Sequence, residues 1–519
     1  MAVSHPEAFR EPAAMNAPLS ATERNAFIPA QALQDIHQVW DREILPQLRD
    51  YIAIPAKSPM FDPRWAEHGH IDAVVSNAAA WVEAQKIQGL KLEILRLEGR
   101  TPVLFFEVPA SGGGQETLQS QERSQRTVLM YGHLDKQPEF NGWRNDLGPW
   151  TPKYEDGKLY GRGGADDGYA VYASIAAIAS LKNQKLSHPR IVGLIETCEE
   201  SGSFDLLPYV DALRGSGGMG KDRLGDVGLV VCLDSGAGNY EQLWLTTSLR
   251  GMASGTLKVE ILTEGVHSGD ASGVVPSSFR ILRHVLDRLE DSATGRLLPA
   301  RLHCEVPAER LAQARATAAI LGEDLYKRFP WVHYDCEGDT RFSLPMTTDP
   351  VQALLNRTWM PTLSVTGAEG LPDLQNAGNV LRPSTAFKLS LRLPPLVDAA
   401  AAVQEVKALL EDNAPYQARV TFEGTGSATG WNAPETAPWF GQALDAASRN
   451  FYGAPCGFIG QGGTIPLMNM LSRGFPQAQM MVCGVLGPKS NAHGPNEFLH
   501  VPYAQRLTAA VAQVIAHMP

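Results

Sequence analysis

The sequence has few cysteines, and none of them are closely spaced. Its six cysteines are spread over 519 residues, and none belongs to a Cys-x-x-Cys motif. So few thiols in so long a chain exclude a small secreted domain stapled by disulfides. The lack of clustered thiolates also argues against a closed structural zinc site. We therefore predict reduced, buried thiols and a cytoplasmic protein.

Long apolar runs and an excess of basic residues are also missing. No stretch approaches the ~20 apolar residues that span a bilayer, and residues 1–30 lack the apolar core of a secretory signal. The 45 Lys and Arg residues are outnumbered by 56 Asp and Glu residues, for a net charge of −11, which argues against a nucleic-acid partner. No Gly-x-Ser-x-Gly motif occurs, which disfavours a serine hydrolase. We predict a globular protein, with residues 1–30 as a flexible tail and neither membrane nor nucleic acid as partner.

The length and the pattern of apolar runs predict more than one domain. A chain of 519 residues is too long for one ordinary core. Short apolar runs at 127–131, 190–195 and 227–233 alternate with helical segments such as 168–181. Runs that are apolar throughout are typical of parallel strands covered on both faces. We therefore predict an α/β domain with a mostly parallel sheet.

The middle of the chain has a different character. Between about residues 244 and 423, alternating strands at 256–262 and 386–393 accompany helical segments at 277–289 and 399–410. This pattern is typical of an α+β unit inserted into the first domain. The predicted organisation is a tail, a first catalytic part, a lid and a second catalytic part, at residues 1–30, 31–245, 246–424 and 425–519.

Polar residues follow each of the three apolar runs. His133 and Asp135 follow the first run, Glu199 and Glu200 the second, and Asp234 the third. Open α/β sheets bind ligands outside the carboxyl ends of their strands. Three such placements in series predict a site at this edge of the sheet.

The candidate metal ligands are imidazoles and carboxylates: His133, Asp166, Glu200, Asp234 and His493. Such ligands suit Zn²⁺ first, with Mn²⁺ and Co²⁺ as alternatives. Five side chains hold two ions if one carboxylate bridges them, and two ions about 3.5–4 Å apart polarise a carbonyl and hold a nucleophilic hydroxide. Taken singly, a histidine at a strand end is more often structural, an Asp pair before a helix is often a cap, and a Glu pair is usually surface. The joint arrangement is what favours a di-metal hydrolase.

Two further acids lie beside the candidate ligands. Asp135 is two residues after His133, and such residues point the same way on an extended backbone, so Asp135 is predicted to accept the ring N–H of His133. Glu199 adjoins Glu200 and is predicted to be the general base that takes a proton from the attacking water and delivers it to the leaving amine.

Eight motifs in a fixed order strengthen this interpretation: GHLDKQP (132–138), GRGGADDG (161–168), ETCEESGS (196–203), LDSG (233–236), VHSG (266–269), LSLRLPP (389–395), GGTIP (462–466) and NAHGPNE (491–497). With these motifs the chain resembles the M20 family of metallopeptidases, in its carnosinase-like dipeptidase branch. The resemblance covers nearly the whole chain after about residue 30.

The resemblance implies how the ligands are shared. His133, Asp166 and Asp234 would hold one ion, while Asp166, Glu200 and His493 would hold the other, with Asp166 as the bridge. Asp135 would orient His133, Glu199 would be the base, and the Asp166–Asp167 peptide bond would be cis.

The resemblance also implies roles for the inserted region. It would be the lid through which the family's members form homodimers, and His267 would reach the active site of the partner subunit to stabilise the oxyanion. Arg392 and the stretch that contains Gly463 and Thr464 would bind the terminal carboxylate of the substrate. Taken alone, Arg392 reads as a surface residue of a strand.

The motifs depart from the family pattern in three places. Gly168 stands where the family usually has Lys, Thr464 replaces the usual Ser, and Gly494-Pro495 replaces a Ser and a polar residue. All candidate ligands remain, so these departures affect the expected substrate preference rather than catalysis. The predicted function is hydrolysis of dipeptides or short peptides. An amidohydrolase acting on N-acyl or N-carbamoyl amino acids, and a non-catalytic binding protein of the same fold, are the alternatives.

Overall fold

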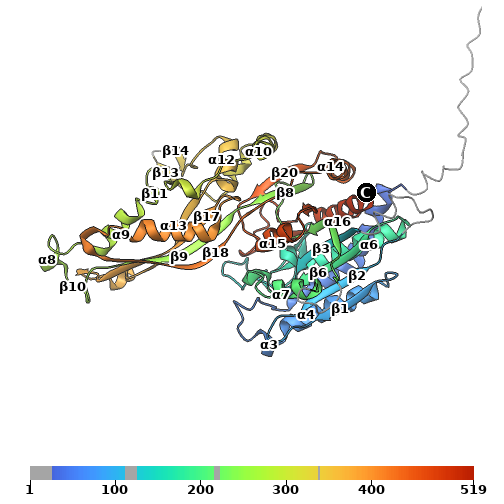
Figure 1. Ribbon diagram of the computed structural model, residues 1–519, viewed down its shortest axis with the longest axis horizontal. Coiled ribbons are helices and arrows are strands. Elements are labelled where there is room, and N and C mark those ends of the chain that lie inside the picture. The colour runs from blue at the N-terminus through green and yellow to red at the C-terminus, as the bar shows by residue number, and fades with distance from the viewer. Residues whose placement is uncertain (1–25, 112–125, 216–221, 337–338) are drawn as a thin grey trace, which may run out of the picture.

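The computed structural model describes residues 26–111, 126–215, 222–336 and 339–519. Figure 1 shows an elongated molecule, with a layered α/β part at one end and a long antiparallel sheet extending away from it. Residues 1–25 of the predicted tail lie outside the described residues. No helix in the described ranges is long and apolar enough to cross a bilayer.

The α/β part is built on a six-stranded sheet. Its strands, in spatial order, are β1 (Lys91–Leu95), β2 (Val103–Val108), β6 (Arg190–Glu196), β3 (Arg126–His133), β7 (Asp226–Cys232) and β21 (Gln479–Val482). β1, β2 and β6 pair antiparallel, whereas β6, β3, β7 and β21 run parallel to their neighbours. The three apolar runs predicted as strands are therefore adjacent in the parallel half of the sheet.

Both faces of the parallel half of this sheet are covered, which explains why β3, β6 and β7 are apolar over most of their length. Along β3, Val128 and Met130 belong to one core and Leu129 and Tyr131 to the other. The first core is formed with α4 (His70–Ala84), α6 (Tyr169–Asn183), α14 (Pro438–Tyr452) and α16 (Val501–Ala516). The second core is formed with α7 (Leu206–Leu213) and α15 (Pro466–Gly474). This layered arrangement confirms the predicted α/β class.

The first helical segment passes its proline without leaving the helix. α1 (Pro29–Val39) continues through a π turn (Trp40–Ile44) into α2 (Leu45–Ala53), whose second residue is Pro46. In the π turn the N–H of Leu45 bonds to the carbonyl of Trp40, five residues back. This wider turn accommodates the proline ring, which otherwise clashes with the carbonyl four residues earlier. The segment therefore packs on the core as one continuous helix.

The inserted part is a four-stranded antiparallel sheet with helices on one face. Its order is β15 (Thr362–Glu369), β17 (Ser384–Leu393), β9 (Gly251–Glu260) and β18 (Arg419–Ala428). Helices α9 (Ser278–Leu286) and α13 (Ala399–Glu411) cover one face and form its core with alternate residues of the strands. β10 (Val266–His267) and α8 (Ser268–Ala271) lie at the end farthest from the α/β part (Figure 1). The inserted α+β unit is thus confirmed as part of the fold class.

Smaller elements complete the inserted part. They are β11 (Glu290–Asp291), β12 (Arg296–Leu297), α10 (Ala308–Leu321), α11 (Asp324–Lys327), β13 (His333–Cys336), β14 (Asp339–Phe342), α12 (Pro350–Thr358) and β16 (Val380–Leu381).

The chain leaves and re-enters the α/β part at one place. A three-stranded sheet contains β19 (Trp431–Asn432), β8 (Trp244–Leu249) and β20 (Gly457–Gln461), in that order. Leu249, just before the insertion, pairs with Trp431, just after it. A second three-stranded sheet contains β22 (Phe498–His500), β5 (Lys158–Tyr160) and β4 (Lys153–Glu155). These two small sheets bring the last part of the chain back to the first.

Candidate metal centre

The parallel strands place three polar segments at one edge of the main sheet. His133 is the last residue of β3, and Asp234 lies two residues after β7. After β6, Glu199 and Glu200 open a short 3-10 turn (Glu199–Ser201). Because β6, β3 and β7 are adjacent and parallel, their carboxyl ends lie together.

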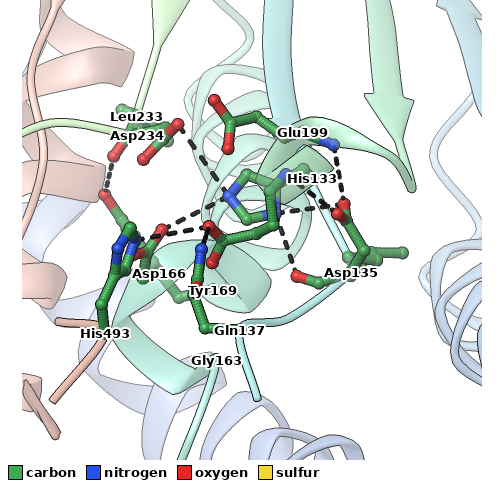
Figure 2. A network of polar contacts seen from close by, with 12 residues as sticks. His133, Asp135, Gln137, Gly163, Asp166, Tyr169, Glu199, Leu233, Asp234 and His493 are labelled. Carbon is green, nitrogen blue, oxygen red and sulfur yellow. Dashed lines mark hydrogen bonds and ion pairs between the residues drawn. The ribbon is translucent and has the colours of Figure 1, made fainter. Parts of the chain in front are cut away.

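Two loops complete the group. Asp166 lies in the turn Gly164–Gly168 before α6, and the Asp166–Asp167 peptide bond is cis, as the resemblance implied. His493 lies in the segment between β21 and β22. Figure 2 shows His133 and His493 approaching Asp166 from different sides.

The five candidate ligands form two triads that share Asp166. One triad is His133, Asp166 and Asp234, and the other is Asp166, Glu200 and His493, with ligand atoms within 4.8 Å of one another in each triad. Nε2 of His133 lies 3.3 Å from Oδ1 of Asp166, and Nε2 of His493 lies 3.0 Å from its Oδ2. The two oxygens of one carboxylate thus face different triads, which is the geometry of a bridging ligand.

The electrostatics of the triads fit divalent cations. Burial raises the pKa of Glu200 well above its usual value, and the charge of Asp166 raises it further. Burial and then Asp166 raise the pKa of Asp234 to about 6. Nε2 of His133 is buried without a hydrogen-bond partner among the described residues. Crowded carboxylates that face an unpartnered imidazole nitrogen are a donor set that a cation stabilises.

The carboxylate of Asp135 lies beside Nδ1 of His133, as predicted, and the backbone carbonyl of Asp135 makes a second contact with the ring. Nδ1 of His133 is 3.1 Å from the backbone carbonyl oxygen of Asp135 and 3.4 Å from its carboxylate. The carboxylate accepts the backbone N–H groups of Glu199 and Glu200 at 3.1 and 3.0 Å. When Nδ1 donates to the carbonyl, Nε2 keeps its lone pair toward the triad. Asp135 therefore orients the turn that carries Glu199 and Glu200 as well as the imidazole.

The carboxylate of Glu199 faces the cavity in which the triads lie. Figure 2 shows its side chain pointing away from Asp135 and toward Asp234. Burial raises its pKa well above the usual value, and the charge of Asp234 contributes next. A raised pKa suits a carboxylate that takes up a proton near neutral pH.

A cavity of about 520 Å³ brings the triads together with the predicted carboxylate-binding residues. Arg392 on β17, Gly463 and Thr464 line it, and the other lining residues include Glu199, Asp166, Glu200, Asp234 and His493. Nη1 of Arg392 donates to the Thr464 hydroxyl at 3.2 Å, and that hydroxyl donates to the carbonyl of Arg250 at 2.6 Å. The loop and the guanidinium are therefore held side by side.

His267 is the one predicted site residue that lies far from the cavity in the structure. It is exposed on β10, at the far end of the inserted sheet (Figure 1), and its Nδ1 accepts the N–H of Gly269 at 3.1 Å. It does not line the cavity of its own chain.

Sequence reasoning missed a buried ion pair that holds the His493 segment. Arg162 and Glu497 are 1% and 0% exposed, and Nη1 of Arg162 lies 2.6 Å from Oε2 of Glu497. The other oxygen of Glu497 accepts the N–H of Gly163 at 3.0 Å. Nη2 of Arg162 donates to the carbonyls of His493 and Gly494 at 3.1 and 2.8 Å. The pair thus ties the turn before Asp166 to the loop that carries His493.

The loop that carries His493 contains several residues other than glycine with positive φ. His493 has φ +65°, and three more residues of the same segment, Lys489, Asn491 and Asn496, also have positive φ. L-residues adopt this region rarely, and they remain in it where surrounding contacts hold them. Both members of the ion pair lie inside quoted motifs, but a motif does not reveal that two loop residues more than 300 positions apart are paired and buried.

Sequence reasoning also missed Gln137, whose side-chain amide donates a hydrogen bond to Oε2 of Glu200.

Comparisons with known proteins agree with this site. The family model described as Peptidase family M20/M25/M40 matches residues 129–517. The cysteinylglycine-S-conjugate dipeptidase of Corynebacterium striatum is 27% identical over 452 residues, which cover 82% of this chain and 88% of that protein. The Beta-Ala-His dipeptidase of Homo sapiens is 28% identical over 361 residues, which cover 66% of this chain and 65% of that protein.

The fold is similar to that of solved structures as well. The structure of the di-peptidase Dug1p from Saccharomyces cerevisiae aligns with a TM-score of 0.68 at 22% identity, over 95% of this chain and 99% of that chain. The matched family region spans most of the chain and contains both triads. The chain belongs to the peptidase family M20/M25/M40.

Proposed function

We propose that this protein is a metal-dependent dipeptidase. The observation that carries the proposal is the position of Asp166 between two triads, in one cavity with the Arg392–Thr464 pair. Paired cation sites beside a receptor for a carboxylate fit a short substrate whose scissile amide lies one residue from its C-terminus. The curated relatives whose names specify dipeptidases support the same activity.

The residues of the cavity are proposed to have three roles: binding the metal ions, transferring a proton and binding the substrate. His133, Asp166 and Asp234 would hold one ion, and Asp166, Glu200 and His493 the other. Zn²⁺ is the first candidate, with Mn²⁺ and Co²⁺ as alternatives. When bound, the two ions would polarise the scissile carbonyl and make water acidic. Glu199 would take the proton of the attacking water and carry it to the leaving amine, while Arg392, Gly463 and Thr464 would hold the terminal carboxylate.

The expected result of a substrate panel is a preference for the dipeptide. We expect Ala-Leu to be hydrolysed with a kcat/KM at least about tenfold above that of N-acetyl-leucine or N-carbamoyl-leucine, in line with the relatives whose names specify dipeptides. All three release leucine, so one assay measures them, with Zn²⁺, Mn²⁺ or Co²⁺ added in turn and metal-stripped protein as the control. Release from the acyl compounds alone would assign the protein to the amidohydrolases. Binding without release from any of them would favour a non-catalytic protein.

We also propose that the protein works as a homodimer through the inserted part. His267 lies too far along the insertion to line the cavity of its own chain, so an oxyanion role requires a second subunit. Its exposed position leaves it free to enter a partner's cavity.

Mixing two inactive variants tests this arrangement. If His267 acts in trans, an equal mixture of Glu199→Gln and His267→Ala subunits regains about a quarter of wild-type activity, since half of the dimers are mixed and each has one complete site. Activity is measured after subunit exchange, and native mass spectrometry verifies the mixed dimers. Mixed dimers without recovered activity would rule out the trans role.

The protein is further proposed to be cytoplasmic. The six cysteines are all free, which is typical of a reducing compartment. Cell fractionation with immunoblotting tests this, and recovery in an extracellular or periplasmic fraction would contradict it.

A further inference from the structure

The inserted sheet presents a row of three side chains to the active-site cavity. Arg392 on β17 pairs directly with Met252 on β9, and Met252 pairs with Ala428 on β18. Residues directly opposite each other in an antiparallel sheet point to the same face. All three line the cavity, whereas their neighbours Ala253 and Leu391 belong to the core on the other face.

The surroundings of Arg392 in this row are apolar. Ile465 follows Thr464, the residue whose hydroxyl accepts a hydrogen bond from Arg392, and it lines the same cavity. Met252, Ala428 and Ile465 are each partly buried, so they form a surface that excludes some but not all water. The guanidinium therefore has apolar groups on both the sheet side and the loop side.

Each charged group that lines the cavity already has a proposed role as a metal ligand, as the general base or as the receptor for the substrate's carboxylate. Among the described residues that line it, the charged or titratable side chains are Arg392, Glu199, Asp166, Glu200, Asp234 and His493. No further acid or base stands next to Met252, Ala428 or Ile465 within that lining. A charged side chain brought there would lose water without gaining a partner, which is unfavourable.

We propose that Met252, Ala428 and Ile465 form the subsite for the side chain of the substrate's C-terminal residue, and that this subsite takes uncharged, apolar side chains. The inference rests on the proposed function, because it places the terminal carboxylate on Arg392. The α-carbon of the terminal residue is bonded to that carboxylate, so its side chain lies within one residue's length of Arg392. Across the sheet, that neighbourhood is Met252 and then Ala428.

A series of substrates with one N-terminal group tests the chemical class. We expect kcat/KM to be at least about tenfold higher for Ala-Leu than for Ala-Asp and Ala-Lys, with the loss mainly in KM. The same order is measured for the N-acetyl derivatives of Leu, Asp and Lys. Cleavage of the acetyl series alone would overturn the dipeptidase proposal but would still report on the subsite. Equal or better cleavage of the Asp or Lys compound, in whichever series is cleaved, overturns the subsite.

A pair of variants on one strand locates the effect. Ala428→Leu fills the end of the row, so we expect kcat/KM for Ala-Leu to fall about tenfold relative to that for Ala-Gly, whose terminal residue has no side chain. Ser427→Leu adds the same side chain one position away, where the exposed Ser427 does not line this cavity, and it should leave the Leu-to-Gly ratio unchanged. Circular dichroism and the melting temperature verify that both variants fold. An equal loss for both dipeptides with Ala428→Leu, or the same shift with Ser427→Leu, contradicts the assignment.

Discussion

We expect Glu199→Gln to lower kcat by about 10²- to 10⁴-fold while the protein keeps its full metal content. Glutamine has the shape of glutamate but takes up no proton from the attacking water. The backbone N–H of residue 199 still donates to Asp135, so the turn that carries Glu200 stays in place. Steady-state kinetics on Ala-Leu and metal analysis by mass spectrometry measure the two parts of this prediction.

The matched control is Glu98→Gln, which makes the same chemical change at an exposed position outside the cavity. It should leave kcat unchanged. Wild-type kcat in Glu199→Gln would remove Glu199 as the base. Loss of metal together with activity would instead assign Glu199 to the ligands.

The second large effect is expected from Asp166→Asn. Because the two oxygens of Asp166 face different triads, loss of its charge weakens both. We expect the protein to retain neither ion after dialysis and kcat/KM to fall by about a thousandfold or more, since the paired ions supply several kcal/mol of transition-state stabilisation.

Single-triad variants make this prediction specific. Asp234→Asn and Glu200→Gln each alter one triad, so each should lose one ion of two. The metal content of the three variants is compared after identical dialysis and reloading with Zn²⁺. Retention of one tightly held ion by Asp166→Asn would show that Asp166 serves only one triad, and the bridge would then be withdrawn.

The site residues at or just after the ends of strands were predictable from the sequence. His133, Glu200 and Asp234 follow apolar runs, and parallel strands bring their carboxyl ends to one edge whatever the loops do. Asp166 and His493 lie in turns with no periodic pattern, and only the shared motifs placed them with the others. Loop positions depend on contacts between distant segments, and such contacts leave no local signal.

Asp135 makes one contact that the local sequence predicts and others that it does not. β3 ends at His133, but the carboxylate of Asp135 still lies 3.4 Å from Nδ1 of His133, as the spacing of two residues predicted. The carbonyl of Asp135 also contacts the imidazole, and its carboxylate accepts two N–H groups of the turn after β6, a contact between distant segments that the local pattern does not reveal. The pair Arg162–Glu497 was missed for a related reason, because burial of two charges in separate loops is decided only by the assembled fold.

The pairing of Leu249 with Trp431 has a consequence for how this protein can diverge. The chain leaves the α/β part and returns to it at adjacent positions, and an insertion with neighbouring ends puts little demand on its host. The segment between these residues is thus a cassette, and its far end, at β10 and α8, can change without moving the two positions that join it to the α/β part. Met252, Arg392 and Ala428 all belong to the cassette, and the five ligands all belong to the host. Changes in the inserted segment can therefore alter three residues proposed to bind the substrate, whereas the five ligands lie, together with Ile465 and Thr464, in the rest of the chain.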